Sequence, residues 1–274
     1  MTRYGMLIDL RSCIGCRACM TACKCNHDIP VGEYEGREYY RIWPLEVELG
    51  EYPYVVRNFT PLLCMHCKAP PCVDACSVLG AIYKREDGII IVDEDKCNGC
   101  RQCVQECPYG AIYFRGDKYI VDKCDLCIEL VDSGLQPECV KACPSDAMFF
   151  GNINDPESKV FKLIKSYNAR PLHPEYNTYP SVYYTAHAGR IKGTVWDPKA
   201  EKPVHGATVT LEDPDNSESF NITTGADGVF FFWRLKVRRF YDIRIEAEGY
   251  SFKKLLKNLA EEYVDIGKIK IEKI

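Results

Sequence analysis

The chain has 274 residues, a formal net charge of −4 and 17 cysteines. Its length is sufficient for two domains with apolar cores. Its charge does not indicate a general nucleic-acid-binding protein, and no segment reaches the run of about 18 apolar residues that a membrane-spanning helix requires. Because cysteine is far above its ordinary frequency, the chemistry of cysteine dominates the interpretation.

So many cysteines have two possible uses, a disulfide framework or metal binding. Disulfide frameworks are typical of short secreted chains that carry a signal peptide. The first ten residues, Met1–Leu10, contain no apolar signal-peptide region and no small-residue cleavage site. We therefore expect metal binding and a cytoplasmic location.

The N-terminal residues predict a strand over Tyr4–Asp9, directly before the first cysteine motif. That motif has the spacing C-x₂-C-x₂-C-x₃-C. Cys25 falls outside the spacing and is interpreted as a free thiol. His27 is interpreted as a surface or hydrogen-bonding histidine rather than a ligand. Residues 26–60 form a polar, aromatic-rich insertion whose aromatic side chains we expect to pack.

The middle of the chain is internally duplicated. The second motif, C-x₂-C-x₄-C-x₃-C, and the third, C-x₂-C-x₂-C-x₃-C-P, are each followed by Gly-Ala-Ile-Tyr and two apolar runs around a turn, at 80–93 and at 110–122. Both segments predict β-hairpins. The repetition of cysteine loop and hairpin indicates two copies of one ferredoxin half-module. The fourth motif is a C-x₂-C pair, a long spacer at 128–138, and a C-x₃-C-P ending.

The C-terminal residues 188–274 contain no cysteine and alternate apolar and polar side chains between turn signals such as Asp227-Gly228. That pattern predicts a small antiparallel β-sandwich, and it resembles the prealbumin-like or Cna-B-type domains, also called carboxypeptidase regulatory-like. Strand alternation favours a core position over a ligand site for four aromatic residues: Trp196, Phe230, Phe232 and Trp233.

The expected fold is therefore α+β, with tandem ferredoxin-like modules followed by an all-β sandwich. We place the iron–sulfur domain at 1–150, a connecting segment at 151–187 and the sandwich at 188–274.

The spacing of the motifs favours iron–sulfur clusters. The third motif has the run by which bacterial ferredoxins hold a [4Fe–4S] cluster, and in two-cluster ferredoxins the fourth cysteine of a run binds the other cluster. Zinc remains an alternative for a single C-x₂-C pair, but it does not explain the third cysteine or the Cys-Pro endings. His66, inside the second motif, is expected to donate a hydrogen bond to cluster sulfur rather than to bind iron.

We pair the second motif with the third, and the first with the fourth, so that each pair exchanges its last cysteines. The predicted ligand sets are Cys13, Cys16, Cys19 and Cys143; Cys124, Cys127, Cys139 and Cys23; Cys64, Cys67, Cys72 and Cys107; and Cys97, Cys100, Cys103 and Cys76. Complete sets of four leave no iron open to substrate and suit the movement of single electrons. The sequence has no Rossmann fingerprint, phosphate loop or nucleophile elbow, so we expect no substrate turnover by this chain alone.

Basic residues next to the cysteines could raise the reduction potentials of the clusters by offsetting their negative charge, or could be ordinary solvated side chains. They are Arg11, Arg17, Lys24, Lys68, Lys96, Arg101, Lys123 and Lys141.

Residues 1–184 resemble the four-cluster electron-transfer subunits of the dimethyl sulfoxide reductase family of molybdoenzymes. The resemblance rests on the first motif, on Cys64-Met-His-Cys67-Lys-Ala-Pro-Pro-Cys72, on Cys107-Pro-Tyr-Gly-Ala-Ile112 and on Lys123-Cys-Asp-Leu-Cys127. It implies three to four [4Fe–4S] clusters and a large catalytic partner in a heterodimer. That partner, not this chain, would carry molybdenum on two pyranopterin guanine dinucleotides.

A cluster subunit followed by a sandwich further resembles the small subunits of the pyrogallol–phloroglucinol transhydroxylases within that family. This resemblance implies a complex that moves a hydroxyl group between polyhydroxylated benzenes. A free polyferredoxin carrier and the electron-transfer subunit of another molybdenum reductase remain alternatives.

Overall fold

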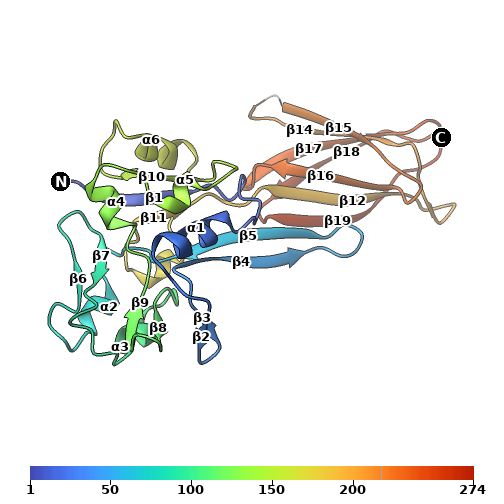
Figure 1. Ribbon diagram of the computed structural model, residues 1–274. Helices are drawn as coiled ribbons and strands as arrows, with labels where there is room; N and C mark the ends of the chain where they lie inside the picture. The colour runs from blue at the N-terminus through green and yellow to red at the C-terminus, as the bar shows by residue number, and fades with distance from the viewer. Residues whose placement is uncertain (217) are drawn as a thin grey trace. The chain divides into compact units, whose positions relative to one another are not determined.

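The computed structural model describes residues 1–216 and 218–274, which form two compact units (Figure 1). The first unit comprises Met1–Glu48 and Arg57–Thr185, and the second comprises Leu49–Val56 and Ala186–Ile274. The prediction of an α+β cluster region followed by an all-β sandwich is confirmed. None of the described helices is long and apolar enough to cross a bilayer.

The first unit contains short helices and strands joined by cysteine-bearing loops. Its elements, in chain order, are β1 (Tyr4–Ile8), α1 (Ala18–Asn26), β2 (Glu33–Tyr34), β3 (Arg37–Glu38), β4 (Ile42–Leu49), β5 (Val56–Leu63), α2 (Pro71–Asp74), β6 (Ile82–Lys84), β7 (Ile90–Val92), α3 (Gln102–Glu106), β8 (Tyr113–Arg115), β9 (Ile120–Asp122), α4 (Ile128–Asp132), α5 (Glu138–Lys141), β10 (Met148–Asn152), α6 (Lys159–Ser166), the 3₁₀ helix η1 (Pro174–Tyr176) and β11 (Val182–Tyr184).

Strand β1 is the centre of a three-stranded sheet, with β10 antiparallel on one side and β11 parallel on the other. Its residues Met6, Leu7 and Ile8 are fully buried, which explains why the strand reads as an unbroken apolar run rather than an alternating one. Helix α6 packs on β10 and β1. Its first turn is capped by the Ser158 hydroxyl, which accepts a hydrogen bond from the backbone N–H of Phe161 at 3.2 Å.

The two predicted hairpins are present as β6–β7 and β8–β9, and α2 packs against α3. The hairpins share one apolar cluster with the second and third motifs, to which each contributes buried aliphatic or aromatic residues: Ile82, Ile90, Ile112, Phe114 and Val121. Cys72 and Cys103 are buried members of the same cluster. Apolar side chains of the first unit thus pack around several of the cysteines and shield them from water.

The second unit is a sandwich of two four-stranded sheets. In one sheet, β12 pairs with β13 and β16, which run antiparallel to it, and with β19, which runs parallel to it. The other sheet has the order β15–β14–β17–β18. The bounds are β12 (Gly189–Asp197), β13 (Lys202–Pro203), β14 (Thr208–Asp213), β15 (Glu218–Thr223), β16 (Val229–Leu235), β17 (Arg239–Glu246), β18 (Lys253–Leu259) and β19 (Tyr263–Lys270).

Alternating burial along the strands builds the sandwich core. In β16, Phe230 and Phe232 face inward and are 0% and 5% exposed. The prediction that Trp233 lies in the core is wrong, because the two-residue period that buries Phe232 turns its neighbour outward and leaves Trp233 70% exposed. Trp196 is half-buried, with the Lys268 ammonium 3.5 Å from its ring centroid.

The second unit also includes Leu49–Val56, a part of the insertion that we place in the first domain from the sequence. Within this unit, the Tyr54 hydroxyl donates a 2.6 Å hydrogen bond to Asp227, and its ring lies 6.0 Å from that of Phe231. The hydrogen bond to the carboxylate raises the pKa of Tyr54 to about 12. Such contacts between residues far apart in the sequence leave no periodic signal.

Candidate metal centres

The first and third motifs adopt the same unusual loop conformation. Gly15 and Gly99, before the second cysteine of each motif, have φ of 68° and 70°, and Arg17 and Arg101, after it, have φ of 61° and 62°. Glycine is required at Gly99, because a Cβ there would lie 2.4 Å from the carbonyl oxygen of Tyr119. Two left-handed residues around the middle cysteine turn each loop back on itself, so that its three thiols can converge.

The first predicted set takes its last member from the fourth motif. Burial is the largest cause of the raised pKa of Cys13, and the thiols of Cys143 and Cys16 raise it further. Burial, Cys13, Cys143 and Cys16 likewise raise the pKa of Cys19 to about 11. The structure therefore brings Cys143 to the three cysteines of the first motif, as the exchange rule predicts.

The complementary set lies where α1 packs against α5. Burial raises the pKa of Cys23 to about 12, and Cys127 contributes to the rise while Arg41 opposes it. Burial and then Cys23 raise the pKa values of both Cys124 and Cys139. The last cysteine of the first motif thus lies among three cysteines of the fourth.

The inner pair shows the same exchange. Burial, then Cys64 and Cys107, raise the pKa of Cys67 to about 11. A pocket is lined by Cys64, Cys67, Cys72 and Cys107 together with apolar side chains. In the remaining set, burial, Cys97, Cys76 and Cys100 raise the pKa of Cys103 to about 12. Cys25 is exposed and belongs to none of these groups.

The thiols fit iron–sulfur clusters chemically. Thiolates are the form that binds metal, and burial together with neighbouring thiolates makes that form costly unless a cation accompanies it. Backbone N–H groups already point at two of the sulfurs: Ala147 donates to Cys143 Sγ at 3.3 Å, and Leu126 donates to Cys124 Sγ at 3.4 Å. Such hydrogen bonds suit a ligand that carries negative charge.

His66 gives an independent test of whether the residues around the second motif fit an iron–sulfur cluster. It is fully buried, and its Nδ1 accepts a 3.0 Å hydrogen bond from the backbone N–H of Ile90. The proton of the neutral ring must then be on Nε2, which has no hydrogen-bond partner among the described residues. A buried donor without an acceptor is costly. A cluster held by the second motif would introduce sulfur acceptors close to this loop, consistent with the role that we predict for His66.

Most of the basic residues beside the cysteines are paired with carboxylates instead of being left free to act on a cluster. Arg11 binds Asp9, Lys96 binds Asp93, and three further pairs follow the same pattern: Arg17–Glu46, Arg101–Glu35 and Lys141–Glu138. Lys123 differs, because it is 2% exposed and its ammonium donates to the backbone carbonyls of Ile90 and Cys124. Position next to a cysteine does not distinguish these cases.

A buried ionic network around the fourth motif was not predicted from the sequence. Arg41 donates to Asp122 at 2.9 Å and to Asp125 at 2.8 Å. Burial opposes the charge of Arg41, but the two carboxylates raise its pKa overall. Asp122 also accepts a 2.6 Å hydrogen bond from the Tyr113 hydroxyl. Asp125 in turn accepts the backbone N–H of Cys127 at 2.8 Å.

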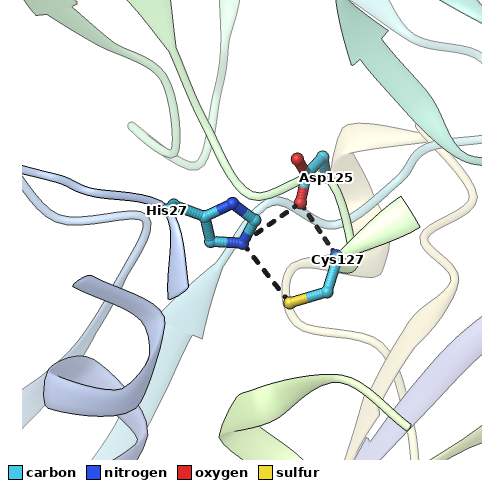
Figure 2. A group of neighbouring side chains, drawn as sticks. All are labelled: His27, Asp125 and Cys127. Atoms are coloured by element: carbon cyan, nitrogen blue, oxygen red, sulfur yellow. Dashed lines mark hydrogen bonds and ion pairs between the residues drawn. The ribbon is translucent and has the colours of Figure 1, made fainter. Parts of the chain in front are cut away.

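His27 also lies beside the fourth motif, next to this ionic network. Figure 2 shows its Nε2 facing both Cys127 and Asp125, 3.3 Å from the sulfur and 3.6 Å from the carboxylate oxygen. The sequence indicated only that His27 could form hydrogen bonds. Its partners come from a segment about one hundred residues away, and only the packing of α1 against the fourth motif reveals them.

These features define an iron–sulfur protein with duplicated ferredoxin-like modules, and comparison with known proteins agrees. Residues 55–153 match the family model described as 4Fe-4S dicluster domain, and residues 11–34 match the 4Fe-4S binding domain. Residues 190–257 match the carboxypeptidase regulatory-like domain. The chain therefore carries [4Fe–4S] clusters.

Individual relatives identify the family. A Halobacterium salinarum chain named as the iron–sulfur subunit of a dimethyl sulfoxide reductase is 37% identical over 67% of this chain and 79% of its own length. A tetrathionate reductase subunit of Salmonella typhimurium is 36% identical, over 71% and 80%. A sulfite dehydrogenase subunit of Allochromatium vinosum is 38% identical, over 67% and 83%. The chain belongs to the iron–sulfur electron-transfer subunits of the dimethyl sulfoxide reductase family of molybdoenzymes.

Proposed function

We propose that this chain holds four [4Fe–4S] clusters and exchanges electrons with a large molybdenum-containing catalytic subunit in a heterodimer. The observation that carries the proposal is the grouping of sixteen cysteines into four sets, each completed by a cysteine of another motif. The ligands are those of the four predicted sets. Because every set is complete, no iron is left open to bind substrate, and the chemistry supplied is the transfer of single electrons.

Neighbouring sets lie close enough for their thiols to interact. After burial and nearer thiols, Cys19 of the first set raises the pKa of Cys139 in the second. Cys64 of the third set likewise contributes to the raised pKa of Cys124. The third and fourth sets share the apolar cluster around the two hairpins. This order supports a continuous path for electrons through the first unit.

The two ends of that path are the accessible ones. Cys16 in the first set and Cys100 in the last are exposed, whereas Cys124 and Cys139 in the middle are buried. Exposed ligand loops suit electron exchange with another protein, and buried ones suit transfer within the chain. A molybdenum centre on two pyranopterin guanine dinucleotides is expected in the partner and not in this chain, as the resemblance to the dimethyl sulfoxide reductase family implies.

The reaction of the complex is the finer part of the proposal. We favour a transhydroxylase that converts pyrogallol to phloroglucinol, supported by the carboxypeptidase regulatory-like sandwich that follows the cluster region. A hydroxyl group moves between polyhydroxylated benzenes without net electron change, so the clusters would set the oxidation state of the molybdenum before turnover. The second candidate is a reductase of another substrate, favoured by relatives named as subunits of tetrathionate reductase and of selenate reductase.

Anaerobic purification from the native organism tests the proposal in two stages. We expect the chain to co-purify with one large molybdenum-containing subunit and to contain about 16 iron and about 16 acid-labile sulfide, four of each per cluster. Elution as a free chain would favour the polyferredoxin carrier instead. Chromatography of the aromatic products then decides the reaction: phloroglucinol formed from pyrogallol supports the transhydroxylase, and its absence together with dithionite-dependent reduction of tetrathionate or selenate supports a reductase.

A further inference from the structure

His27 lies directly after α1, and its Nε2 is 3.3 Å from the sulfur of Cys127. The imidazole is only 14% exposed, so the contact is largely shielded from water. The Asn26 side chain makes a longer contact, with its amide nitrogen 4.0 Å from the same sulfur. Figure 2 shows that the ring presents its edge, and not its face, to the sulfur, which is the orientation of an N–H donor.

The direction of this hydrogen bond follows from the chemistry of the ligand. A cysteine bound to iron is a thiolate, which can accept a hydrogen bond but has no proton to donate. The Nε2 of His27 must then carry the hydrogen that lies between the two atoms. Neutral imidazole can place its single proton on Nε2, so the interaction does not require a charged ring.

Asp125 is placed to reinforce the arrangement. Its carboxylate lies 3.6 Å from His27 Nε2 and accepts the backbone N–H of Cys127 at 2.8 Å. It therefore favours a protonated Nε2 and holds the cysteine in position. The three side chains have ligand atoms within 4.8 Å of one another, an arrangement that could also hold a single metal ion. Cys127, however, belongs to a complete set of four thiols, so it is committed to the cluster.

We propose that His27 donates a hydrogen bond to the Cys127 thiolate and thereby raises the reduction potential of the cluster held by Cys23, Cys124, Cys127 and Cys139. Reduction adds negative charge to the cluster and its sulfurs, so a donor aimed at one of those sulfurs stabilises the reduced form more than the oxidised form. His27 is a positioning and tuning residue, not an iron ligand. The inference rests on the ligand set of the proposed function.

The consequence is selective, because this contact joins His27 to a sulfur of only one predicted set. Loss of the hydrogen bond should lower the affinity of that cluster for an electron by about tenfold, which corresponds to ~59 mV for a one-electron couple. The other three clusters should keep their potentials.

The test is an anaerobic redox titration of the purified complex monitored by electron paramagnetic resonance. His27→Phe removes the donor, and His27→Gln keeps an N–H close to the position of Nε2. His205→Phe, at an exposed residue of the second unit, is the matched control. We expect one cluster to shift to lower potential in His27→Phe, a smaller shift in His27→Gln, and no shift in the control.

A second measurement does not depend on the size of any shift in potential. In the complex labelled with ¹⁵N-histidine, hyperfine spectroscopy of the reduced clusters should detect a histidine nitrogen coupled through the hydrogen bond, and this coupling should be absent from the labelled His27→Gln complex, which distinguishes it from a coupling to His66. Absence of that coupling from the wild-type complex, or unchanged potentials in an iron-complete His27→Phe complex, would overturn the inference. Loss of a single iron in His27→Phe would also overturn the inference, because it would indicate a separate metal site at His27, Asp125 and Cys127. A wild-type chain without clusters would instead refute the proposed function.

Discussion

Replacement of Arg41 by methionine should markedly destabilise the first unit. The Arg41 side chain is 11% exposed and bridges Asp122, which is 6% exposed, and Asp125, which is 19% exposed. Removing one partner of a buried ion pair costs about 3–5 kcal/mol. The surviving hydrogen bonds from Tyr113 to Asp122 and from Cys127 to Asp125 offset part of that cost. We therefore expect a loss near the lower end, about 3 kcal/mol.

The assay is the anaerobic bleaching of the visible cluster absorption by an iron chelator. When local opening is fast, the rate of attack follows the population of the open form. A loss of about 3 kcal/mol then increases the bleaching rate roughly 100-fold. Arg57→Met is the matched control, because Arg57 and Glu48 form an ion pair in which both side chains are 58% exposed, and such pairs contribute about 0–1 kcal/mol. Equal bleaching rates for the two variants would refute the reasoning.

Three further outcomes can be measured. Cys107→Ser should alter the paramagnetic signal of the cluster held by the second motif and leave that of the third motif intact; the reverse would contradict the exchange of ligands. Phe232→Ala should cost about 3–5 kcal/mol in urea unfolding of the sandwich, whereas Trp233→Ala should change stability by about 0.5 kcal/mol or less, and equal losses would contradict the strand register. Removal of iron should unfold the first unit and leave the cysteine-free sandwich resistant to protease; proteolysis of both at one rate would show that the sandwich depends on the clusters.

Much of the architecture was predictable because its determinants are local. Glycine and cysteine spacing sets the conformation of the motif loops, and the turn between two apolar runs produces each hairpin, as at 80–93. Two-residue alternation correctly predicted a sandwich after residue 188. The error at Trp233 came from reading hydrophobicity without its phase, since residues 232 and 233 must face opposite sides of a strand.

The surroundings of the clusters were less predictable, because they depend on contacts between distant segments. Arg41 lies in an insertion without cysteines, yet it binds two carboxylates about eighty residues away. Judged by sequence position, the residues next to cysteines were the better candidates for tuning the cluster potentials. Arg17 and Arg101, however, bind surface glutamates. The assignment of Leu49–Val56 to the second unit likewise depends on contacts between segments that are distant in the sequence. Single-sequence patterns report periodicity and local chemistry, and they do not report which side chains meet.

Anomalous diffraction at the iron absorption edge, from crystals of the anaerobically purified complex, tests the central claim most directly. Four compact groups of iron should appear in this chain, and the group bonded to Cys64, Cys67 and Cys72 should also be bonded to Cys107. Iron that joins Cys107 to Cys97, or cysteine sets without iron, would contradict it.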